Sequence, residues 1–156
     1  MGAPCACQSK NGGQVNRPVP RYRGAMRRHR FIDRIRVLRG DSTEGAGESA
    51  GLPLLDGAEL PTAVVAYHDR SAVGLFTAFR RAGVGVPGVL SVAGHDDDKL
   101  SRLACFDLAT VSQNAGEQAR RAVAAVVERL KHGRTAPREI VLTPSLVIRG
   151  TTAVAR

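Results

Sequence analysis

Residues 60–98 read LPTAVVAYHDRSAVGLFTAFRRAGVGVPGVLSVAGHDDD, and this stretch decides the fold of the chain. Two apolar, β-branched runs, at 62–66 and 89–93, are typical of buried strands. Between them, the apolar side chains of residues 71–82 recur at helical spacing and predict a helix with one apolar face. A connection of this length suits a parallel crossover. We therefore predict an α/β fold with a parallel sheet flanked by helices.

Each of the two predicted strands is followed by the same polar pair. The first leads to His68 and Asp69, and the second leads to His95 and Asp96. Ligands of parallel sheets bind outside the carboxyl ends of the strands, so neighbouring strands would bring both pairs to one crevice. For Asp69 we favour a different role, as the N-cap of the helix that follows.

The same four side chains allow an alternative chemistry. His68, Asp69, His95 and Asp96 could together hold a metal ion and support metal-dependent hydrolysis. No other residue with ligand spacing supports such a site, and we expect neither a cofactor nor an enzyme.

The positive charge of the chain is concentrated at one end. The net charge is +9, and residues 1–39 carry ten Lys or Arg and one acid, while the remaining residues carry thirteen of each sign. A basic run can bind phosphate backbones. It is also typical of a solvated or poorly ordered segment. Nucleic-acid binding through residues 17–39 is therefore kept as an alternative function, and residues 1–20 are expected to be irregular.

Several segment types are not indicated. No stretch has the length and apolarity of a membrane span, and the N-terminus lacks the apolar core of a secretory signal. The three cysteines show no disulfide or metal spacing. We expect a cytoplasmic protein without a membrane partner.

The rest of the chain shows weaker patterns and one strong one. Residues 115–132, opened by Asn114 and closed by Gly133, carry apolar side chains at regular helical spacing. The further predicted elements are a helix over 21–36, a strand at 37–38, a helix over 44–56, and strands at 139–142 and 145–149.

Four blocks of the sequence resemble the C-terminal part of the lactose-repressor/galactose-repressor (LacI/GalR) family of bacterial transcriptional regulators. The blocks are PTAVVAYHDRSAVGL (61–75), RRAGVGVPGVLSVAGHDDD (80–98), DLATVSQNAGEQARRAVAAVVERL (107–130) and REIVLTPSLVIRGTT (138–152). Their order and spacing match the family over about residues 60–152.

The resemblance implies a periplasmic-binding-protein-like sensor of type I, in which two α/β subdomains clamp a small metabolite, most simply a sugar. Residues 21–152 would be part of such an effector-binding and dimerisation domain, with 153–156 as a tail. The family also implies a homodimer. It recognises DNA through a helix-turn-helix headpiece, and we expect none in this chain.

Three positions match ligand contacts of the family. Arg21 matches its ligand-reading arginine, Asp96 matches the aspartate of its Gly-aromatic-Asp-Asp block, and His68 stands where Asn is usual. The resemblance also suggests that the helix face bearing Phe76 and Phe79 is an interface between two copies.

Overall fold

A computed structural model describes residues 4–9, 18–133 and 136–154 of the chain. It contains a six-stranded sheet in the order β2-β1-β3-β4-β5-β6, parallel throughout except for the antiparallel pair of β5 and β6. The strands are β1 (Pro4–Ser9), β2 (Arg36–Gly40), β3 (Ala63–Val65), β4 (Ser91–Asp96), β5 (Ala109–Ser112) and β6 (Ser145–Val147). The helices are α1 (Pro18–Arg28), α2 (Glu44–Leu55), α3 (Asp69–Arg81) and α4 (Ala115–His132), with a short 3-10 helix η1 (Ile32–Arg34). The predicted parallel α/β fold is confirmed.

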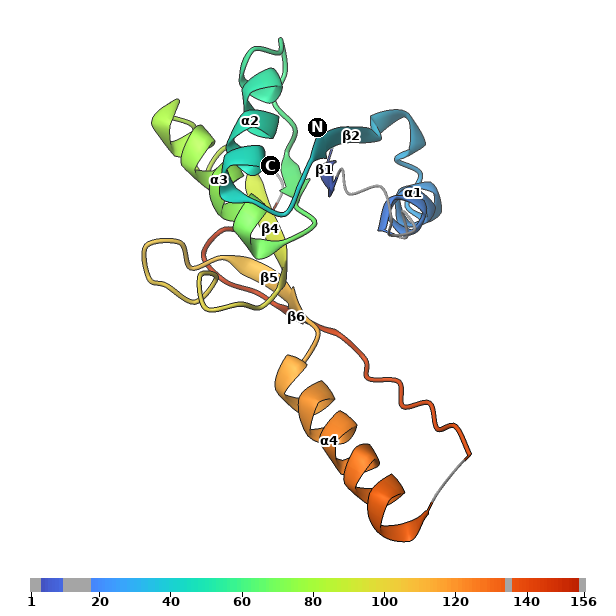
Figure 1. Ribbon diagram of the computed structural model, residues 1–156. Helices are drawn as coiled ribbons and strands as arrows, with labels where there is room; N and C mark the ends of the chain where they lie inside the picture. The colour runs from blue at the N-terminus through green and yellow to red at the C-terminus, as the bar shows by residue number, and fades with distance from the viewer. Residues whose placement is uncertain (1–3, 10–17, 134–135, 155–156) are drawn as a thin grey trace.

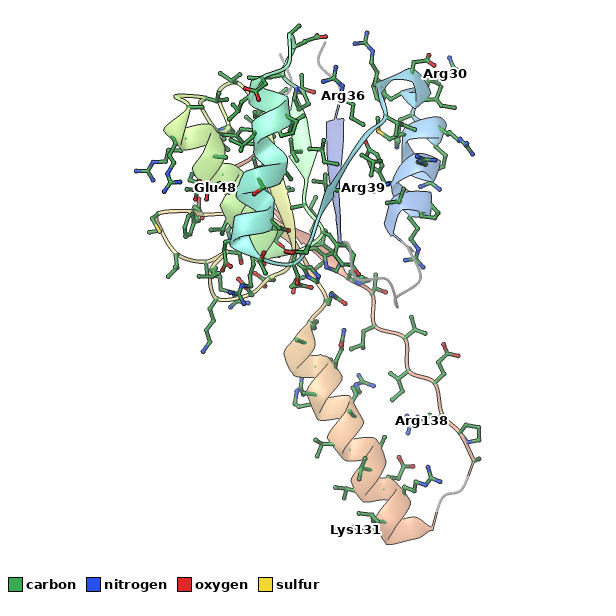
Figure 2. All side chains as sticks on the ribbon, turned by 45° about the horizontal axis from the view of Figure 1, so that its top comes forward. Arg30, Arg36, Arg39, Glu48, Lys131 and Arg138 are labelled. Carbon is green, nitrogen blue, oxygen red and sulfur yellow. The ribbon has the colours of Figure 1, made fainter. Side chains whose placement is uncertain are left out.

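Helices cover both faces of the sheet. α2 and α3 pack side by side on one face, and α1 lies on the opposite side of the strands (Figures 1 and 2). The main core lies between α3 and the central strands, where Leu75, Phe79, Val64 and Val92 are fully buried. Each buried side chain of this size contributes about 1.5–3 kcal/mol relative to exposure.

This packing shows that the prediction of Phe79 as an interface residue is wrong. Phe79 has no exposed surface and belongs to the core, so it is not available to a second copy. Phe76 is half-buried, and its ring stands edge-on to that of Phe106 at a centroid distance of 5.7 Å. The apolar face of α3 therefore packs inside the domain.

α2 and α3 approach each other closely enough to exclude a side chain. A Cβ at Gly47 would lie 2.8 Å from the carbonyl carbon of Ser71, and one at Gly74 would lie 2.7 Å from the backbone nitrogen of Glu48. Both neighbours are backbone atoms, which cannot rotate away. Glycine at these two positions thus sets the distance between the helices.

The N-terminal region differs from the prediction of an irregular segment over 1–20. Residues 4–9 form β1, which lies inside the sheet between β2 and β3, with Cys5 opposite both Arg36 and Val64. A strand with two parallel neighbours is fixed by backbone pairing on both sides, and its small residues give no apolar period to detect. The proposed domain start at residue 21 is wrong for the same reason, while the limit at residue 152 stays a prediction. Residues 1–3 and 10–17 lie outside the described residues.

The helix predicted over 21–36 begins earlier and is much shorter. α1 ends at Arg28, and Arg30 adopts a left-handed conformation with φ 61°. The chain then turns through η1 into β2, which includes the strand predicted at 37–38. The irregular apolar spacing after Arg28 reflects this turn.

α4 matches its prediction and projects away from the sheet (Figure 1). Asn114 accepts a hydrogen bond from the backbone nitrogen of Glu117, and Gly133 ends the helix with φ 60°. The apolar stripe of the helix is open to solvent, with Leu130 79% exposed. Within the described residues, no helix is long and apolar enough to span a membrane.

The strand predicted at 139–142 does not form. Residues 136–144 run as extended chain near α4, and within the described part of this C-terminal segment β6 alone joins the sheet, pairing with β5 through Leu146 opposite Val111. β5 ends at Ser112, so residues 139–142 have no described strand beside them to complete a ladder. A strand pattern without a partner strand gives extended chain.

Candidate functional site

The central crossover brings two predicted site residues together. β3 and β4 are parallel neighbours, with Val65 opposite Ala93, so their carboxyl ends lie at the same end of the sheet. His68 follows β3 and Asp96 ends β4, and the Nδ1 atom of His68 lies 2.7 Å from the Oδ2 atom of Asp96. The predicted meeting of these side chains is confirmed.

Two further side chains complete the polar cluster. The Nδ1 atom of His95 lies 3.1 Å from Oδ1 of Asp96, and the side-chain nitrogen of Gln113 donates to the same oxygen at 2.8 Å. We call His68, His95, Asp96 and Gln113 the Asp96 cluster. Sequence reasoning missed Gln113, although it directly follows β5, the next parallel strand, and the strand-end rule would have found it.

The position of His68 follows from the start of α3. His68, not Asp69, is the N-cap of this helix. Its backbone nitrogen donates to the hydroxyl of Ser71 at 3.3 Å, and that hydroxyl donates back to the carbonyl oxygen of His68 at 2.9 Å. The ring of Tyr67 stands edge-on to the imidazole at a centroid distance of 4.4 Å. These contacts fix the side chain at the open end of the sheet.

Asp69 was predicted as an N-cap, but its side chain instead supports the turn that follows β4. Its side chain is buried, and its two oxygens accept hydrogen bonds from the hydroxyl of Thr110 and, at 2.8 Å, from the backbone nitrogen of Asp98. Local sequence could not show this, because Thr110 lies 41 residues away. Burial raises the pKa of Asp69, and the hydrogen bonds from Thr110 and Asp98 only partly oppose it.

These bonds hold the turn that presents Asp96. Asp96 and Asp97 have positive φ values of 116° and 56°. The backbone nitrogen of Asp97 donates to the Thr110 hydroxyl at 3.4 Å. The carboxylate of Asp97 is engaged as well, since Arg149 and Arg102 donate to it at 2.6 and 2.8 Å.

The Asp96 carboxyl is held in its charged form. Burial would raise the pKa of Asp96, but hydrogen bonds from His95, His68 and Gln113 outweigh this effect and lower it. The side chains of His68 and Asp96 remain 31% and 34% exposed, so a ligand can reach them. The cluster is thus an ionised, accessible carboxylate between two imidazoles.

Arg21, the third predicted ligand contact, is not joined to the cluster. It lies on α1 with an exposed side chain, and no hydrogen bond or ion pair among the described residues links it to the cluster. Its role stays a prediction.

The metal-site alternative lacks a ligand set. In the ranges that the structure covers, no group of three or more His, Cys, Asp and Glu side chains could hold a metal ion. Asp69, which the alternative needs, is engaged by Thr110 and Asp98 instead of facing His68.

Known proteins share both sequence and fold with this chain. Residues 8–152 match the model of the periplasmic binding protein-like domain. An uncharacterized HTH-type transcriptional regulator of Streptomyces limosus is 38% identical over 72% of this chain and 31% of its own length. The HTH-type transcriptional repressor CytR of Escherichia coli (strain K12) is 32% identical over 78% of this chain and 36% of its own.

Solved structures agree with these relatives. A LacI transcriptional regulator from a Rhodococcus species superposes with a TM-score of 0.88 at 32% identity, covering 97% of this chain and 56% of the other. A LacI-family regulator from Enterococcus faecium with bound ribose has the same fold, with a TM-score of 0.84 at 21% identity, and covers the same shares. The chain spans about a third of the length of the curated relatives and about half of these structures. It belongs to the periplasmic-binding-protein-like family and is part of an effector-binding domain of the LacI-family type.

Proposed function

We propose that the Asp96 cluster binds a sugar or a similar polyhydroxylated metabolite. The supporting observation is the ionised, partly exposed carboxylate of Asp96 between the imidazoles of His68 and His95. The ribose-bound relative from Enterococcus faecium supports a sugar as the ligand class.

The hydrogen-bond pattern favours a ligand that donates. An ionised carboxylate only accepts, so the Nδ1 atom of His68 donates to Asp96. A neutral imidazole that donates at Nδ1 accepts at Nε2. Oδ1 of Asp96 has two partners and Oδ2 has one, which leaves an acceptor site on Oδ2. The cluster therefore offers a carboxylate oxygen of Asp96 and the Nε2 acceptor of His68, which suits neighbouring hydroxyl groups.

Regulation of transcription is the wider role that we infer. The relatives are transcriptional regulators, not enzymes, and two of them are named as HTH-type. Operator binding would be carried by a headpiece of the kind those names describe, acting with this domain in the cytoplasm. The effector would change the conformation of the domain and thereby the affinity for DNA.

A homodimer is part of this proposal. The exposed apolar stripe of α4, with Val123, Val126 and Leu130, gives it a surface that protein should cover. Sedimentation of the chain at micromolar concentration tests this point. A well-folded monomer at all concentrations would contradict self-association.

Ligand binding can be tested by thermal melting with a panel of pentoses, hexoses, disaccharides and nucleosides. A ligand present at a hundredfold excess over its Kd adds about 2.7 kcal/mol to the free energy of unfolding. We expect one class to raise the Tm of the native chain and of Asp33→Asn, an exposed acid on η1, but not of Asp96→Asn. A shift that survives in Asp96→Asn, or no shift with any panel member, would refute a sugar site at this cluster.

A further inference from the structure

A second charged surface lies on the opposite side of the sheet from α2 and α3. Eight exposed arginines occupy α1, the turn after it, η1 and β2, and Asp33 is the one acid among residues 18–40. We call them the arginine face: Arg21, Arg23, Arg27, Arg28, Arg30, Arg34, Arg36 and Arg39. Figure 2 shows Arg30, Arg36 and Arg39 around α1 and β2.

The burial of α1 determines that its arginines point outward. Met26 is 7% exposed, and Tyr22 and Ala25, on the same side of the helix, are half-buried. This inward stripe leaves Arg23 and Arg27 on the opposite side, one helical turn apart, where both are exposed. The sheet thus anchors the helix and presents its guanidinium groups to solvent.

Several other arginines of the chain are held in ion pairs that most of the arginine face lacks. Arg70 pairs with Glu44 at 2.9 Å and Arg149 with Asp97 at 2.6 Å. Within the described ranges, no ion pair engages the following members of the face: Arg21, Arg23, Arg27, Arg28, Arg30, Arg36 and Arg39. Guanidinium groups without an ionic partner, gathered on one helix and the strand that follows it, repel one another and gain from a polyanion.

We propose that the arginine face binds the phosphate backbone of duplex DNA without reading its sequence. All eight cations are arginine, whose planar fork matches phosphate oxygens, and none is lysine. α1 has 11 residues and a length of about 16 Å, along which a duplex carries about ten phosphate charges. Charged residues on an edge strand also prevent pairing with other chains, which accounts for Arg36 and Arg39 but not for the arginines of α1.

Such a contact would act beside a headpiece and not in place of one. A domain that regulates transcription stays close to DNA, so a weak, sequence-independent contact gains from the high local concentration of phosphates. This function is additional to effector binding, because α1 and the Asp96 cluster share no described bond. Arg21 stays unchanged in every variant, since it is also a predicted ligand contact.

The test measures binding of the full chain to a 30-base-pair duplex of arbitrary sequence by fluorescence anisotropy, between 50 and 200 mM salt. Neutralising about five phosphates gives a slope of about −4.5 for log K against log salt, or a fall of about 500-fold over this range. The triple variant Arg23→Gln, Arg27→Gln, Arg28→Gln should make the slope less steep by about 2.7.

A matched control removes the same charge elsewhere. Arg80→Gln, Arg129→Gln and Lys131→Gln change exposed cations of α3 and α4 and should leave the slope unchanged. The triple Arg23→Lys, Arg27→Lys, Arg28→Lys keeps the charge and should keep the slope while weakening binding, which separates charge from misfolding.

Three results would overturn the proposal: no binding at 50 mM salt, equal slopes for the α1 variant and the control, or tighter binding to anionic phospholipid vesicles than to DNA. The α1 Gln variant should keep any sugar-induced rise in Tm, and Asp96→Asn should keep DNA binding. Failure of one function is therefore distinguishable from failure of the other.

Discussion

The close contact of α2 and α3 gives a quantitative prediction at Gly74. A Cβ at this position would overlap the carbonyl oxygen of Glu44 and lie 2.7 Å from the backbone nitrogen of Glu48. Both atoms belong to α2, so relief requires the helices to move apart. Overpacking of this kind costs about 1–3 kcal/mol. The upper part of that range applies, because no flexible side chain can absorb the overlap.

The helix propensity of alanine opposes this cost. Replacing a glycine inside a helix by alanine gains about 1 kcal/mol, so Gly74→Ala should lower the free energy of unfolding by about 2 kcal/mol. For a domain of this size the expected fall in Tm is about 4–8 °C. Gly24 in α1 is the matched control, since a Cβ there meets nothing within 4 Å. Gly24→Ala should therefore gain up to about 1 kcal/mol.

Urea unfolding followed by far-ultraviolet circular dichroism measures both variants. Equal m-values with midpoints displaced in opposite directions would support the reasoning. A Gly74→Ala variant as stable as the native chain, or more stable, would refute the packing described for α2 and α3. Because α3 begins beside His68, the same variant should also weaken any ligand that the native chain binds.

Three further predictions concern charge and exposure. Because folding lowers the pKa of Asp96, the unfolded chain binds more protons than the folded chain just below the ordinary carboxyl pKa of about 3.9. Stability therefore falls as the pH drops from that value through the pKa of Asp96 in the folded chain. Asp96→Asn should flatten this dependence in urea midpoints measured from pH 5 to 2. Arg149→Met leaves the half-buried Asp97 with Arg102 as its remaining ionic partner and should lower the free energy of unfolding by about 1–3 kcal/mol in urea unfolding, whereas an unchanged midpoint would show that the pair adds nothing. Leu130→Gln should change the stability of the chain by less than about 0.5 kcal/mol and reduce association in light scattering.

The sequence was most informative where periodicity and strand-end position agree. The crossover over residues 60–98 predicted both β3 and β4, and their shared direction predicted that His68 and Asp96 meet. α4 was equally clear, because its cap, apolar period and terminal glycine all occur in sequence order. Local patterns sufficed for these elements because their determinants are local.

The errors arose where distant segments decide the outcome. β1 owes its place to pairing with β2 and β3, and its own composition gives no strand signal. Asp69 stands where the sequence predicts an N-cap, but its side chain is buried beneath the Asp96 turn. Its oxygens accept hydrogen bonds from Thr110 and Asp98 instead. Phe79 lies on an apolar helix face that could equally suit a core or an interface, and only the sheet beneath α3 decides between them.

The two carboxylates near the strand ends have opposite electrostatic environments and separate tasks. Burial raises the pKa of Asp69, while donors around Asp96 lower the pKa of that carboxyl. Asp69 binds the backbone of the turn at Asp98, and the turn in turn holds Asp96 at a φ of 116°, a conformation that non-glycine residues adopt only under constraint. A buried acid thus stabilises a strained backbone that presents an exposed one. Recognition at this cluster would then rest on a rigid strand end, which limits the entropy lost when a ligand binds.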